Sequence, residues 1–152
     1  MSRVMRVKEL QLTGKAGDDA TCEDSVIAND RFVAVIDGTT SLVSTGEGEL
    51  SPGKKAVNLV SEMIEKMPGE IAAEDFFRRL NDGLSESYRR EGIYEKAKSN
   101  PEYRTSAAAI VYSRAYSELW LVGDCQALVD DKPVTSWKNA DCAMPCASPD
   151  RD

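Results

Sequence analysis

The chain has 152 residues, of which 41% are hydrophobic and 30% are charged, and its 19 basic and 26 acidic side chains give a formal net charge of −7. This length suits one domain with a sizeable core, since domains usually contain roughly 100–200 residues. The negative charge argues against nucleic-acid binding, which needs a basic surface. The sequence contains no histidine, which excludes Ser-His-Asp triads, imidazole general bases and His-ligated zinc.

The N-terminus and the cysteines indicate where the protein acts. Residues 1–12 carry charges where a signal peptide needs an unbroken apolar stretch. No segment approaches the roughly 18 consecutive apolar residues of a membrane-spanning helix. We therefore expect a cytoplasmic protein with no membrane partner. The cysteines form no C-x-x-C pair and are interpreted as reduced thiols, with a four-cysteine zinc site as the weaker alternative; they are Cys22, Cys125, Cys142 and Cys146.

The first elements in chain order are strands. A strand is predicted at about residues 5–12, and the polar stretch 13–21 is expected to be a loop. Two β-rich runs then follow, Ser25–Ala28 and Arg31–Ile36, separated by Asn29-Asp30. Asn and Asp tolerate the positive φ that a two-residue hairpin turn demands, so the pattern predicts a β-hairpin.

Two long helices are predicted next. Ser51-Pro52 is typical of an N-cap followed by proline at the first helical position, and Pro68-Gly69 ends the first helix. The second helix is expected from about Ala73 to Glu91. Both show apolar residues at helical spacing, namely Ala56, Val60, Met63, Ile64 and Met67 in the first and Phe76, Phe77, Leu80, Leu84 and Tyr88 in the second.

Strands return after the helices, with Gly123-Asp124 as a tight turn between the last two. They are expected at Thr105–Tyr112, Ser117–Val122 and Gln126–Asp130. This order predicts an α+β fold, an antiparallel β-sheet or sandwich with two long helices packed on its outer face. We expect one domain over residues 1–132 and an irregular tail over 133–152.

Hairpin geometry gathers carboxylates at one end of the first strand pair. With Asn29-Asp30 at the turn, Ala28 would lie opposite Arg31, and Cys22 opposite Asp37. Neighbouring positions on paired strands have Cβ atoms about 4.5–8 Å apart. The open end of the hairpin would then hold three carboxylates, Glu23, Asp24 and Asp37.

Crowded carboxylates repel one another unless a cation lies between them. Oxygen ligands suit Mg²⁺, Mn²⁺ or Ca²⁺. The alternative is that these residues are solvated strand ends. Asp37 favours the first interpretation, because it directly follows the apolar run Phe32–Ile36 and a buried, unpaired charge is costly.

Four segments, in this order around the two helices, resemble the metal-dependent type 2C protein serine/threonine phosphatases over about residues 4–130. They are Cys22-Glu23-Asp24-Ser25, Phe32-Val-Ala-Val-Ile-Asp37-Gly38, Arg104-Thr-Ser-Ala-Ala-Ala-Ile-Val111 and Leu121-Val-Gly123-Asp124-Cys-Gln-Ala127. The resemblance implies an incomplete version of the family's β-sandwich, because only its N-terminal half is matched.

The resemblance also implies roles for the acidic residues. Asp37 would bridge two Mg²⁺ or Mn²⁺ ions, with a carbonyl ligand from Gly38 and a direct or water-mediated ligand from Glu23. Asp24 would hold a metal-bound water, and Asp124 would bind a third, weaker metal. Asp37 and Asp24 would therefore be the catalytic residues. Two metals activate a bridging water, so hydrolysis needs no protein nucleophile.

At some positions the sequence differs from the family pattern. Asp19 stands where the family usually has a phosphate-binding arginine, and Lys15 is the nearest basic residue. Thr39 replaces a residue that in some members is a histidine. Two further metal-binding aspartates of the family have no counterpart.

We expect a phosphatase-like protein that acts on a phosphorylated protein or a small phosphoester. Whether the chain itself is active stays open. One alternative is a non-catalytic phosphatase-like module that binds a protein partner. Another is a fragment whose exposed sheet edge drives self-association.

Overall fold

The protein is described by a computed structural model, which covers residues 5–13, 22–38, 50–104 and 107–135. Within these ranges, no helix is both long and apolar enough to cross a membrane. The elements in chain order are β1 (Asp24–Ala28), β2 (Phe32–Gly38), α1 (Pro52–Lys66), α2 (Ala73–Arg90), α3 (Tyr94–Ser99), a 3-10 helix η1 (Pro101–Tyr103), β3 (Ala107–Ser113), β4 (Glu118–Val122), β5 (Gln126–Val129) and β6 (Lys132–Thr135).

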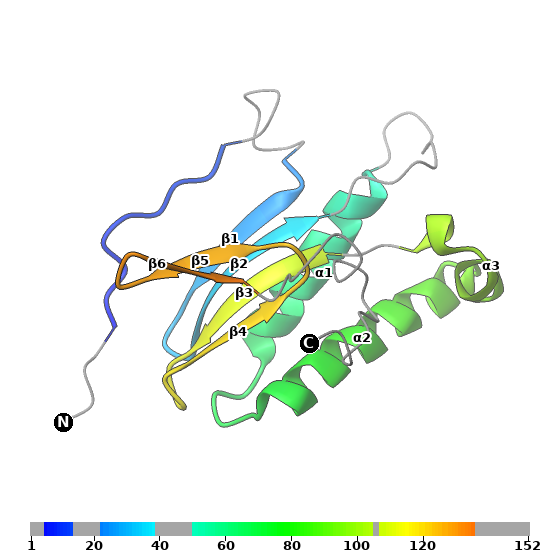
Figure 1. Ribbon diagram of the computed structural model, residues 1–152. Coiled ribbons are helices and arrows are strands. Elements are labelled where there is room, and N and C mark those ends of the chain that lie inside the picture. Colours follow the sequence, from blue (N-terminus) through cyan, green and yellow to red (C-terminus); the bar gives the residue numbers. More distant parts are fainter. Residues whose placement is uncertain (1–4, 14–21, 39–49, 105–106, 136–152) are drawn as a thin grey trace, which may run out of the picture.

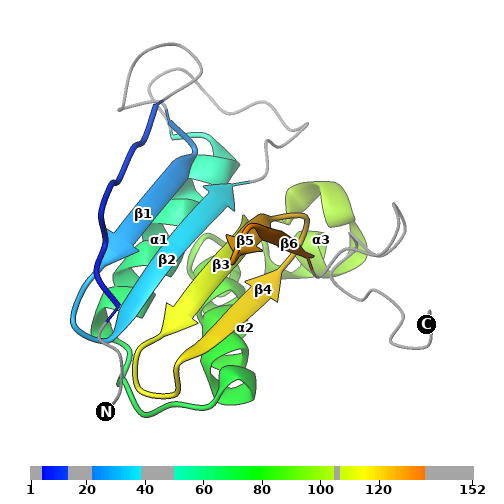
Figure 2. The same cartoon turned by 60° about the vertical axis from the view of Figure 1, so that its left-hand side comes forward.

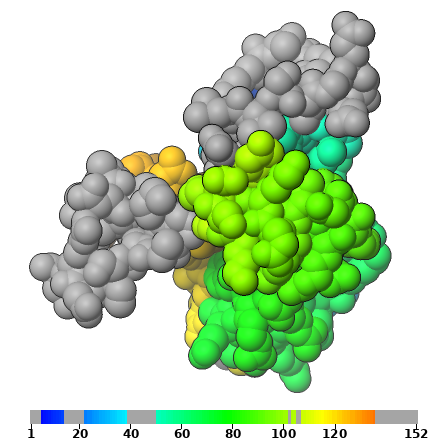
Figure 3. All heavy atoms as spheres, turned by 90° about the vertical axis from the view of Figure 1, so that its right-hand side faces the viewer, coloured from blue at the N-terminus to red at the C-terminus, as the bar shows by residue number. Residues whose placement is uncertain are grey.

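The expected α+β class is confirmed. Strands β1 to β4 form an antiparallel sheet in the order β1-β2-β3-β4, and β5 and β6 form a separate two-stranded sheet. Helices α1 and α2 cover one face of the larger sheet (Figure 1), and β5–β6 lies on the other side (Figure 2). Viewed from the helix side, the atoms of the helices hide most of the strands (Figure 3).

The core lies between the larger sheet and the two long helices. Its centre is an aromatic cluster in which the Phe76 ring lies 5.2 Å from Phe32 and 5.1 Å from Trp120, measured between ring centroids. All three side chains are at least 94% buried. Phe32 comes from β2, Phe76 from α2 and Trp120 from β4, so this cluster holds the sheet and the second helix together.

Both ends of α1 are fixed by side chains. Ser51 is the N-cap, and its Oγ accepts a hydrogen bond from the Lys54 backbone N–H at 3.2 Å. At the other end, the Arg31 guanidinium donates to the Met67 carbonyl at 3.0 Å and also to that of Glu65. A cation at a helix C-terminus is favourable because it faces the negative end of the helix dipole. Both predicted helices are confirmed, the first as α1 and the second as α2.

The turn between β1 and β2 differs from the predicted one. The Asn29 N–H donates to the Phe32 carbonyl at 2.9 Å, while Asn29 Oδ1 accepts from the N–H groups of Arg31 and Phe32, each at 2.8 Å. Among the described non-glycine residues, only Ser117, Asp130 and Asp131 have positive φ. Asn29 therefore closes the turn with its side chain and not through positive φ.

This turn moves the register by two residues. Ala28 pairs with Val33 and Asp24 with Asp37, so the expected pairing of Cys22 with Asp37 is wrong. The physical reason is that Asp30-Arg31, and not Asn29-Asp30, forms the tip of the turn. A shift of two keeps every side chain on its expected face, because strand side chains alternate with a period of two.

Other sequence predictions need correction. Residues 5–13 form no strand. The side chains from position 6 to position 13 are exposed, Val7, Leu10 and Leu12 among them, so this stretch does not join the buried core. Gly123 has a φ of 82°, but β4 and β5 lie in different sheets and Gly123-Asp124 is not a hairpin turn. Strand β6 extends into the region expected to be an irregular tail, of which residues 136–152 lie outside the described ranges.

The first prediction tests how the β1–β2 turn is held. Asn29→Ala removes the acceptor for two backbone N–H groups, so we expect the free energy of unfolding to fall by about 1–2 kcal/mol. Asn29→Asp keeps an acceptor oxygen and is expected to stay close to wild type. Urea denaturation measures both. Equal stability of Asn29→Ala and wild type would contradict this account of the turn.

Candidate functional site

The open end of the β1–β2 hairpin carries two opposed carboxylates. Asp24 and Asp37 are direct Cα partners, and Asp37 in turn pairs with Ala108 on β3. Ser25, beside Asp24, contacts α1 through a 3.0 Å hydrogen bond between its Oγ and that of Ser61. Because strand side chains alternate, Asp24 and Asp37 therefore lie on the sheet face away from the helices.

Asp37 is exposed on this face. The expectation of a costly buried charge at Asp37 is therefore wrong, because the position alternates with the buried residues Ile36 and Gly38. Its accessibility leaves the carboxylate within reach of solvent ions. The two like charges still face each other across the strands, an arrangement that is unfavourable without a cation.

Glu23 lies apart from this pair, at the N-terminus of α1. Its Oε1 accepts a 2.6 Å hydrogen bond from Ser51 Oγ, and its backbone carbonyl accepts a 2.9 Å bond from the Gly38 N–H. The N-terminal end of a helix dipole favours a negative charge. Glu23 thus has a structural role at the junction of β1, β2 and α1, beyond the ligand role that the resemblance implies.

Gly38 is needed at this junction because the backbone packs closely around it. A Cβ atom at this position would lie 2.6 Å from the carbonyl oxygens of both Glu23 and Gly53, and 2.7 Å from Val57 Cγ2. Such contacts are far inside van der Waals distance. Gly38 therefore fixes how closely the strand end approaches α1.

Asp124, two residues after the end of β4, lies at the same end of the sheet as Asp24 and Asp37. Ala109 pairs with Val122, so Gly123 follows in the row of Ala108 and Asp37. A Cβ at Gly123 would lie 2.6 Å from that of Ala108, which confirms the close approach of these two strands. Asp124 is the next residue and is exposed.

Cys125 lies near all three of these carboxylates. Its thiol is free, and its pKa is raised from 9.0 to about 11, first by burial and then by the negative charges of Asp37, Asp124 and Asp24. A thiol of this kind is protonated at neutral pH and is not a nucleophile. Sequence reasoning missed Cys125 as a neighbour of the site; its only signal was its position next to Asp124.

We call Asp24, Asp37 and Asp124 the acidic cluster. Over the described parts of the chain, no group of three or more Cys, Asp or Glu side chains is arranged as a ready set of metal ligands. The three carboxylates lie at the same end of the sheet but do not surround a single metal position. Lys15, Asp19 and Thr39 lie outside the described residues.

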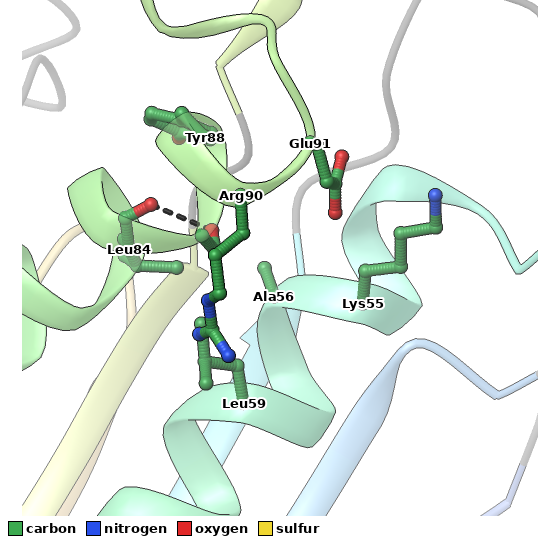
Figure 4. Close-up of a pocket in the computed structure, with 8 residues that line it drawn as sticks. Lys55, Ala56, Leu59, Leu84, Tyr88, Arg90 and Glu91 are labelled. Carbon is green, nitrogen blue, oxygen red and sulfur yellow. Dashed lines mark hydrogen bonds between the residues drawn. The ribbon is translucent and has the colours of Figure 1, made fainter.

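A separate pocket of about 320 Å³ lies between α1 and α2. The guanidinium of Arg90 extends from α2 towards Leu59 on α1, and Glu91 lies opposite Lys55 across the mouth (Figure 4). Leu84 and Tyr88, expected on the core face of α2, line this pocket. The pocket is built from helix side chains and contains none of the predicted site residues.

Comparisons with protein-family models, with curated proteins and with solved structures each found no match.

The second prediction uses Cys125 as a probe of the acidic cluster. Asp37→Asn removes a negative charge beside the thiol and should lower its pKa from about 11, so that more thiolate is present at pH 8.5. We expect alkylation of Cys125 by iodoacetamide to become several-fold faster, as measured by peptide mapping with mass spectrometry. Asp30→Asn, at the far end of the hairpin, is the control. An unchanged rate in Asp37→Asn would contradict the proximity of these groups.

Proposed function

We propose that this protein is a metal-dependent, phosphatase-like hydrolase acting on phosphoserine, phosphothreonine or a small phosphoester. The observation that carries the proposal is the Asp24–Asp37 pair at an accessible sheet end. Asp124 lies close enough to influence the same thiol as this pair. These are residues to which the resemblance to type 2C phosphatases assigns metal contacts.

The donor set suits a hard cation. Carboxylate oxygens favour Mg²⁺ or Mn²⁺, and opposed carboxylates gain most when a cation reduces their repulsion. Asp37 would hold the ion, Asp24 would hold a water bound to it, and Asp124 lies nearby for a weaker ion. The ligand role that the resemblance gives to Glu23 would have to coexist with the hydrogen bond that its Oε1 accepts from Ser51.

When bound, divalent cations supply an activated water and neutralise the charge of a phosphoryl group. The chain itself would position that water and its proton. Without histidine, proton transfer near the phosphoryl group would fall to carboxylates, and Asp24 is suited to hold a water by a hydrogen bond to its carboxylate oxygen. Cys125 stays protonated and would add no competing nucleophile.

A second function of a different class is a non-catalytic phosphatase-like module that binds a protein partner. The separation of Glu23 from the acidic cluster favours it, because the described carboxylates do not close into a ligand set. We also propose a cytoplasmic location, which the free thiols of Cys22 and Cys125 support.

The third prediction concerns cation binding. A ligand that binds only the native state raises its stability, so Mn²⁺ at about ten times its Kd should raise Tm by about 3–6 °C. Asp37→Asn should lose most of this gain, and Asp30→Asn should retain it. Differential scanning fluorimetry in Mn²⁺ and in metal-free buffer measures the shifts. Equal shifts in all three proteins would exclude a specific site at Asp37.

The fourth prediction separates the two functions. We expect slow, Mn²⁺-dependent hydrolysis of p-nitrophenyl phosphate that Asp37→Asn abolishes, because a cation held by few protein ligands stays loosely bound and mostly hydrated. The initial rate in millimolar Mn²⁺ and after chelation measures it. A Tm shift without hydrolysis would identify the non-catalytic module. Fast, saturable turnover would show that further ligands complete the site.

A further inference from the structure

The four-stranded sheet is apolar on both faces, although the helices cover only one. The register forms two apolar rows on the other face, which we call the open face. The rows are Ala28–Val33–Tyr112–Leu119 and Val26–Val35–Ile110–Leu121. Val35 is 48% exposed. Strands with apolar residues on both sides are typical of sheets that are covered on both sides.

A second unpartnered apolar element lies on the same side of the molecule. The β5–β6 hairpin, which we call the arm, projects from the open face (Figures 1 and 2) and is not hydrogen-bonded to the larger sheet. Leu128 is 74% exposed and Val129 is 46% exposed. An isolated two-stranded hairpin is at best marginally stable in water, so the arm gains stability from any apolar surface that covers it.

The tip of the arm is acidic, and this charge sets the direction in which the arm can lie on an open face. Asp130 and Asp131 form its tip with φ values of 50° and 63°, the pattern of a type I′ turn that fits the twist of paired strands. The tip would be repelled by the acidic cluster at one end of the open face. At the opposite end lies a cationic side chain, the Arg114 guanidinium, which donates to the carbonyls of Asn29 and Met5 at 2.8 and 2.7 Å.

We propose that the arm of one copy of this chain packs on the open face of a second copy, reciprocally, with the arm tip towards Arg114. Four strands about 4.8 Å apart and about five residues long make a face of about 300 Å². Two reciprocal contacts, counting all four surfaces, bury at most about 1,200 Å², the lower limit of specific interfaces. A weak, concentration-dependent dimer is therefore expected.

This proposal does not rest on the proposed function, since Val35 and Leu128 belong to no metal or catalytic position. It also differs from pairing through a sheet edge, because the contact is between an arm and a face. Edge pairing would add backbone hydrogen bonds and would not depend on the side chain at position 128.

The fifth prediction tests this assembly by sedimentation velocity between 5 and 500 µM. The wild-type protein should shift from monomer to dimer, whereas Leu128→Glu and Val35→Glu should each stay monomeric over this range. Leu50→Glu is the matched control, because Leu50 is 47% exposed but precedes α1, and it should dimerise like wild type. Circular dichroism should show all variants folded. Wild type that stays monomeric at 500 µM would overturn the proposal, as would a dimer that survives both substitutions.

A crosslink identifies the contact directly. In a chain whose four native cysteines are replaced by serine, Val35→Cys and Leu128→Cys proteins are mixed and oxidised. A disulfide between the two different proteins, in clear excess over the homodimers, is expected. A crosslink that forms only within one chain carrying both substitutions would mean that the arm covers its own sheet, and would overturn the exchange between copies.

Discussion

The register of β1 against β2 is the constraint on which the remaining structure depends. Asn29 sets it by accepting two backbone hydrogen bonds within the turn. Arg31 leaves the same turn to bind the end of α1, and Arg114 ties the turn to β3 and to Met5. Because this end is fixed, the alternation of β2 sends Phe32 into the aromatic core and Asp37 to the accessible face at the other end.

Features specified by local signals could be predicted from the sequence. The first helix begins and ends as expected because Ser51, Pro52 and Pro68 limit it through cap geometry and backbone restriction. The α+β class followed from the change between strand and helix periods. That Asp37 lies at a strand end was also predictable, since an apolar run stops directly before it.

Features that depend on distant contacts could not be predicted. The predicted turn at Asn29-Asp30 and the observed one at Asp30-Arg31 overlap in sequence, and the hydrogen bonds of the Asn29 side chain select the second. Glu23 turns to Ser51, 28 positions later, a partner that hairpin geometry alone does not reveal. Because of Pro133, the segment that forms β6 was predicted to be irregular. Proline is nevertheless tolerated in a strand with one free edge.

The acidic cluster and the apolar rows share one face, and this couples their energetics. Two carboxylates about 5 Å apart in water repel each other by only about 1 kcal/mol. An occupant of the apolar rows would border the acidic cluster and exclude water from it, which strengthens both the repulsion between carboxylates and their attraction for a cation. Covering the open face would therefore strengthen the binding of a cation held by the acidic cluster. By linkage, a cation bound there would favour the covered face to the same degree.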